Sequence, residues 1–168
     1  DGLPFVPRDG ERNQAQVNQG DAPRFSQLFT EVKALALAWH LTHQPAYALK
    51  AGAWLRAWMV TPATRMKSDL QRAQIRLGRD NNQGASGGII DALRFHELLE
   101  AISLLKDSPA LDAADDNAVR SWLSDYYAWL TTSENGKQER AKLNNHGTWY
   151  LSQAASLAAY LGQTNDVR

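Results

Sequence analysis

The side chains best suited to chemistry lie in one run near the C-terminal end, from Asn144 to Tyr150, which reads Asn-Asn-His-Gly-Thr-Trp-Tyr. Amides and an imidazole can bind a carboxylate and transfer a proton, and flat aromatic rings can stack on sugar faces. Together these groups indicate a site suited to the cleavage of an acidic polysaccharide.

The same run also has a structural interpretation. Asn144 and Asn145 are favourable N-cap residues for a helix, and both interpretations can hold because a helix N-terminus itself receives carboxylates well. Trp149 suits core packing and sugar stacking equally. Tyr150 follows His146 by four residues, so it shares a helical face with the imidazole and either contacts sugar or packs.

A second group of polar candidates surrounds a long irregular stretch in the middle of the chain. Residues 62–87 show no helical pattern, and residues 78–88 are polar and rich in glycine. Long loops inside compact domains are usually lids or binding loops. Gln74 and Arg79 therefore have two open interpretations, as substrate contacts or as parts of a solvated loop.

The elements that must position these residues are predicted to be helices, because no segment alternates with a period of two. An extended arm rich in glycine, proline and polar residues is expected over 1–22, and a helical domain over 23–168. Within that domain the apolar spacing predicts helices at about 21–43, with Asp21 as N-cap, and at 45–61, 89–105 and 114–132. A turn at 133–136 and a short helix or turn ending at Ala141 should follow. The last helix is expected at 146–161, with Gly162 as its stop. The predicted fold class is all-α, with antiparallel helix pairs arranged as a toroid or a solenoid.

Many other conspicuous residues fit structural roles. Asp115 and Asp116 are expected to favour a helix N-terminus, and the mixed charges of 137–142 are expected to form a solvated face. Five tryptophans at helical spacings are expected in the core: Trp39, Trp54, Trp58, Trp122 and Trp129.

Composition narrows the classes of function. The chain has 168 residues, 43% of them hydrophobic, which is enough for one domain with a core. Its 18 basic and 18 acidic residues balance, so there is no overall field to hold nucleic acid, and an acidic polymer needs locally placed Arg, His and Asn. No apolar run approaches the roughly 18 residues of a membrane helix. We therefore expect neither nucleic acid nor membrane as a partner.

Neither a metal nor a cofactor is expected. The chain has no cysteine, and its four histidines, at positions 40, 43, 96 and 146, form no recognisable metal site with nearby carboxylates. Arg94 and His96 fit better as structural partners of Asp91 or Glu97.

Several segments, taken together, resemble the alginate lyase family. They are 1–11, Leu55-Arg56-Ala57-Trp58, 62–66, Gln74, Gly78-Arg79, 88–91 and the Asn-Asn-His run at 144–150. The resemblance spans nearly the whole chain and implies an incomplete α/α toroid with a long groove. It also implies a polysaccharide lyase that acts on a uronic-acid polymer such as alginate or glucuronan.

The resemblance implies roles for particular residues. Asn145 and His146 match the positions that neutralise the substrate carboxylate, and His146 is also a candidate base. The groove would be lined by Gln74, Arg79, Asn144, Trp149 and Tyr150. The family's catalytic Tyr and an Arg lie in a segment after the Asn-Asn-His helix, so the chain is expected to correspond to the N-terminal part of such a protein.

Two classes of function follow from these observations. The first is a lyase that cleaves a 4-linked uronic-acid polymer by β-elimination and leaves unsaturated uronate ends. The second is a non-catalytic helical module, a truncated lyase, that binds acidic polysaccharide. The start at Asp1, without Met, is interpreted as the product of processing, which favours a periplasmic or secreted protein. An incomplete toroid would expose apolar helix faces and favour a homodimer or a second chain fragment.

Overall fold

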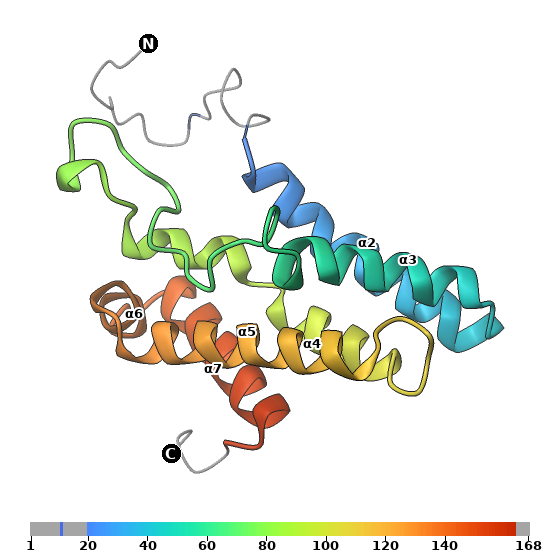
Figure 1. The fold of residues 1–168 in the computed structure, drawn as a ribbon. Helices are drawn as coiled ribbons and strands as arrows, with labels where there is room; N and C mark the ends of the chain where they lie inside the picture. Colours follow the sequence, from blue (N-terminus) through green and yellow to red (C-terminus); the bar gives the residue numbers. More distant parts are fainter. Residues whose placement is uncertain (1–10, 12–19, 164–168) are drawn as a thin grey trace.

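The computed structural model describes Glu11 and residues 20–163, and all regular structure within them is helical (Figure 1). The predicted all-α class is therefore confirmed, while most of the predicted arm lies outside the described residues. The elements, in chain order, are α2 (Ala22–Thr42), α3 (Pro45–Leu55), the π-helix η1 (Arg56–Val60), the 3-10 helices η2 (Asp80–Asn82) and η3 (Ser86–Ala92), α4 (Phe95–Leu104), α5 (Ala113–Thr132), α6 (Glu134–Arg140) and α7 (Asn145–Leu161). None of the described helices is long and apolar enough to cross a membrane.

The helices α2 and α3 form an antiparallel hairpin (Figure 1). The helix α2 ends because His43 adopts a left-handed conformation, with φ at 52°, and its N–H donates to the carbonyl oxygen of Trp39. Pro45 then starts α3, where a missing N–H costs nothing. Asp21 takes the predicted N-cap position of α2, but its carboxylate makes no capping hydrogen bond.

The helix predicted at about 89–105 is broken in the structure. A 3-10 helix, η3, covers Ser86–Ala92, and α4 begins only at Phe95. The backbone of Ala73 lies so close to Gly88 that an added Cβ there would come within 2.8 Å of its carbonyl oxygen. This close approach of the preceding loop binds η3 to the loop, and the chain turns at Arg94 before α4 starts.

The C-terminal helices follow the prediction more closely. Asp112 caps α5, and Ser133 caps α6 by accepting from the backbone N–H of Gly136. The helix α6 therefore begins at Glu134, where a turn was expected. Gly162, with φ at 77°, ends α7 as predicted.

The core joins α4, α5 and α7 to the α2–α3 hairpin, since α4 packs on α2 and α7, and α5 packs on η1, α6 and α7. The rings of Phe95 and Tyr126 stack with centroids 4.7 Å apart. The buried hydroxyl of Tyr126 donates to Oε1 of Gln153, and the amide nitrogen of Gln153 donates to the carbonyl oxygen of Ile89. These two buried hydrogen bonds join η3 to α5 and α7. They therefore fix η3 and the central loop before it against α7, the helix that carries His146.

Candidate active site

The N-terminus of α7 positions the central imidazole. The side chain of Asn144 accepts a 3.0 Å hydrogen bond from the backbone N–H of His146, so the N-cap interpretation of Asn144 is confirmed. Asn144 and Asn145 are exposed, and the His146 side chain is 27% exposed. The amides and the ring therefore stand at the surface, where a ligand can reach them.

A buried carboxylate supports this imidazole. Oε1 of Glu139, on α6, lies 2.5 Å from Nδ1 of His146. Its other oxygen, Oε2, lies 2.6 Å from Nζ of Lys142 in an ion pair that lacks hydrogen-bond alignment. Glu139 is fully buried, whereas Lys142 is half-buried.

Gly147 permits this arrangement. A Cβ at Gly147 would overlap the carbonyl oxygen of Lys142, so only glycine allows the α6–α7 turn to fold back onto the first turn of α7. The tight turn is what brings Glu139 within reach of an imidazole seven residues later. The predicted solvated face at 137–142 is therefore wrong for Glu139 and Lys142.

The central loop meets His146 at Gly87. A Cβ added at Gly87 would lie 3.6 Å from Cε1 of His146, 3.6 Å from Nζ of Lys142 and 3.9 Å from Oε1 of Gln74. The structure thus brings Gln74 and His146, two of the predicted site residues, to the same place. Gln74 has a left-handed backbone with φ at 52°, a strained conformation of the kind found at functional sites.

Asp91 holds the Gln74 side chain. The amide nitrogen of Gln74 donates a 2.9 Å hydrogen bond to Oδ1 of Asp91. Asp91 remains exposed to solvent, but its partial burial raises the pKa of its carboxyl, and the hydrogen bond from Gln74 opposes that shift.

A groove of about 800 Å³ runs from this point between the start of α2, the end of η1 and the loop at 64–74. Gln74 belongs both to the groove wall and to the surroundings of Gly87, so it links the groove to the space beside His146. Its aromatic lining comes from Phe25 and Trp58.

The charged lining of the groove is unevenly balanced. Its four cations are Arg24, Arg65, Lys67 and Arg72, and its three anions are Asp21, Asp69 and Asp91. The groove therefore has a local basic excess that the balanced overall charge conceals.

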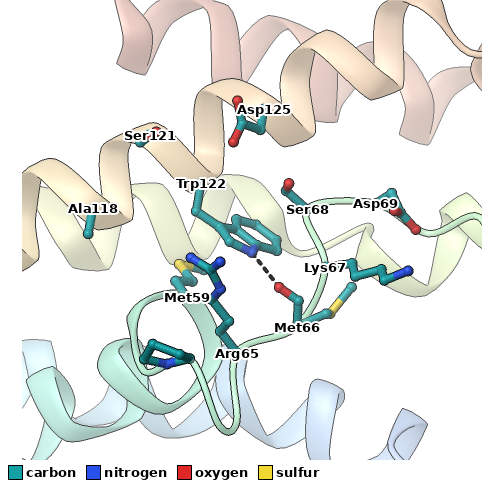
Figure 2. A pocket seen from close by; sticks show the side chains of 11 residues that line it. Met59, Arg65, Met66, Lys67, Ser68, Asp69, Ala118, Ser121, Trp122 and Asp125 are labelled. Atoms are coloured by element: carbon teal, nitrogen blue, oxygen red, sulfur yellow. Dashed lines mark hydrogen bonds between the residues drawn. The ribbon is translucent and has the colours of Figure 1, made fainter.

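A second hollow, of about 510 Å³, lies between the segment 65–69 and α5 (Figure 2). The indole nitrogen of Trp122 donates a 2.8 Å hydrogen bond to the carbonyl oxygen of Met66 (Figure 2). This bond anchors the segment that carries Arg65 and Lys67 to α5. Trp122 is buried in the core as predicted, and it also fixes one wall of the groove.

The other three predicted site residues, Trp149, Tyr150 and Arg79, lie in different surroundings. Trp149 is half-buried and stacks on His96, with ring centroids 6.4 Å apart and planes 14° apart. Tyr150 is only 3% exposed and its hydroxyl donates to the carbonyl oxygen of Leu130, so the expectation that it lines the groove is corrected to core packing. Arg79 is exposed just before η2, and it is absent both from the groove wall and from the surroundings of Gly87.

Structural roles predicted for other charged residues are confirmed. Arg94 donates two hydrogen bonds to Glu97, and Lys33 donates a third. These bonds, with Arg94 as the main cause, lower the pKa of Glu97 to about 2. Asp115 lies in the first turn of α5 and pairs with Arg56. Within the described part of the chain, no group of three or more His, Asp or Glu side chains could hold a metal ion.

The helical scaffold defines an all-α protein of the incomplete α/α toroid class. The sequence matches the family model described as alginate lyase over residues 1–168, so the chain belongs to the alginate lyase family. It is also similar to the crystal structure of an alginate lyase from Bacteroides ovatus, with 29% sequence identity and a TM-score of 0.93. That match covers 99% of this chain and 44% of the Bacteroides chain, so this chain spans less than half of the other protein's length. A comparison with curated proteins gives no significant match.

Proposed function

We propose that the protein is a polysaccharide lyase that cleaves a 4-linked uronic-acid polymer, such as alginate or glucuronan, by β-elimination. The observation that carries the proposal is the position of His146 beside a groove with a basic lining, in a chain of the alginate lyase family. The Bacteroides protein of similar fold is itself described as an alginate lyase.

The chemistry requires the proton at C5 of a uronate to be removed while the neighbouring carboxylate carries negative charge. Donors that neutralise this carboxylate stabilise the developing enediolate, as donors of an oxyanion hole do. The side-chain amide of Asn145 takes this role, and Lys142 places a positive charge beside Gly87. His146 shares the role only when its ring is protonated, because the neutral ring that acts as base keeps no N–H for the carboxylate.

A base must then take the C5 proton, and His146 is the candidate within the chain. As the C5–H bond breaks, its electrons form the C4=C5 double bond, and the C4–O4 bond breaks. The leaving O4 gains its proton from solvent water. Tyr150 does not supply it in this scheme, because its hydroxyl is buried against Leu130.

The groove residues would hold the polymer on either side of this centre. Arg65, Lys67 and Arg72 can pair with uronate carboxylates, and Trp58, which is half-buried, can offer an apolar ring face to a sugar. A charged polysaccharide does not cross a lipid bilayer unaided. We therefore further propose that the protein acts in the periplasm or outside the cell.

The test is absorbance of the unsaturated uronate, with the protein incubated separately with alginate, polymannuronate, polyguluronate and glucuronan. A rise with one polymer supports the proposal and identifies the substrate. A flat trace with all four, together with retained binding of oligouronate, contradicts it and makes the protein a binding module.

A further inference from the structure

The carboxylate of Glu139 is the one fully buried acidic side chain among the described residues, and both of its oxygens face a partner. Burying an ionised carboxylate is costly unless it is paired and hydrogen-bonded. The partner of Oε1 is Nδ1 of His146 and the partner of Oε2 is Nζ of Lys142. A buried charge is therefore concentrated on the side of the imidazole that faces away from solvent.

The other ring nitrogen of His146 is differently placed. In the part of the chain that the structure describes, no protein hydrogen bond to Nε2 is found, whereas Nδ1 has the carboxylate. The Cε1 edge of the ring faces Gly87, where the absence of a side chain leaves room next to Gln74. The ring is thus fixed at one nitrogen and open at the other.

We propose that Glu139 is the positioning residue of His146. Its carboxylate accepts from Nδ1–H, which keeps that nitrogen protonated and leaves the lone pair of the neutral ring on Nε2. Lys142 forms an ion pair with the second carboxylate oxygen, so both oxygens of Glu139 have a partner.

The catalytic consequence rests on the proposed function: Nε2 is then the atom that takes the C5 proton from the uronate. The hydrogen bond itself does not depend on that function. A merely structural Glu139 would tie α6 to α7 and leave the protonation of His146 unchanged, so the ring nitrogens provide the readout that separates the two roles.

The experiment is NMR of protein labelled with ¹⁵N in histidine, followed from about pH 5 to about pH 10, because an ordinary imidazole titrates near 6.5. The His146 signals are assigned by their loss in His146→Gln. We expect the wild-type ring to carry a proton on Nδ1 in its neutral form. A neutral ring protonated on Nε2 in the wild type would overturn the proposal without any variant.

The matched variants are Glu139→Leu and Glu134→Leu, which remove an acid from the same helix, one buried and one exposed. We expect Glu139→Leu to shift the neutral ring toward the Nε2–H form, and Glu134→Leu to leave it unchanged. An unaltered ring in folded Glu139→Leu would contradict the proposal. If that variant does not fold, Glu139→Met, with a more adaptable apolar side chain, replaces it, and the wild-type spectrum still decides.

Kinetics supply the second readout. If the protein is a lyase, Glu139→Leu should lower kcat on the order of 10²-fold or more with little change in KM, since carboxylates that orient a catalytic histidine have effects of this size. A KM effect alone would indicate a binding role. Absence of lyase activity in the wild type would refute the proposed function and leave the NMR result on Glu139 standing.

Discussion

The amide nitrogen of Gln74 donates to Oδ1 of Asp91 at 2.9 Å and so joins the central loop to η3. This bond leaves the amide oxygen of Gln74 as the atom that faces the space at Gly87. An amide oxygen accepts hydrogen bonds and repels a carboxylate. Under the proposed function, Gln74 would therefore contact a sugar hydroxyl, and the donors on the α7 side would bind the carboxylate.

Asp91→Asn should keep or raise the free energy of unfolding at pH 7. Burial raises the pKa of Asp91 in the folded state, so the ionised group is a penalty to folding at neutral pH. The penalty disappears as the pH falls below the ordinary pKa of an aspartate, about 3.9. The stability advantage of Asn over Asp should disappear over the same range. Urea unfolding between about pH 3 and 7 measures this, and a loss above about 1 kcal/mol at pH 7 would show that the charge itself is needed.

Glu97→Gln should have the opposite dependence on pH. The pKa of Glu97 is lowered to about 2, chiefly by Arg94. The ionised carboxylate therefore stabilises the folded state fully at pH values above its unfolded-state pKa of 4.5. We expect the variant to lose about 2 kcal/mol at pH 7, after allowance for solvent screening of the half-exposed Lys33. The difference from wild type should shrink as the pH falls from 4.5 towards 2. A difference independent of pH would refute this electrostatic origin.

Gly87→Ala and Gly88→Ala form a matched pair on η3. A Cβ at Gly87 makes ordinary contacts with His146, Lys142 and Gln74, whereas one at Gly88 would lie 2.6 Å from Cβ of Ala73. Gly87→Ala should change the free energy of unfolding by no more than about 0.5 kcal/mol. It should still raise the KM for polyuronate, because the added methyl group narrows the site beside His146. Gly88→Ala should lower stability by about 1–3 kcal/mol, as overpacking does. Equal thermal shifts in the two variants would contradict this assignment.

The sequence predicts the fold well where local signals agree. The α2–α3 break at His43 and Pro45, the cap at Asn144 and the stop at Gly162 all depend on residues with strong backbone preferences. The division of the helix predicted at 89–105 was missed, because it depends on contact between η3 and the backbone of Ala73.

The candidate site is only partly predictable for the same reason. Gln74 and His146 were identified, and the structure places them together. Glu139 was read as part of a solvated charge run, because its burial depends on a tight turn at Gly147 that brings α6 against α7. Tyr150 was misassigned because a shared helical face with His146 does not say which side of α7 faces the core.

The most direct test of the account is the rate of release of unsaturated uronate by His146→Ala, compared with wild type and with His40→Ala. His40 is exposed in the last turn of α2 and serves as the matched control. We predict that His146→Ala abolishes the absorbance rise on the polymer that the wild type cleaves, while its circular dichroism remains that of a folded helical protein and His40→Ala retains full activity. Undiminished release of unsaturated uronate by folded His146→Ala would contradict the assignment of the active site.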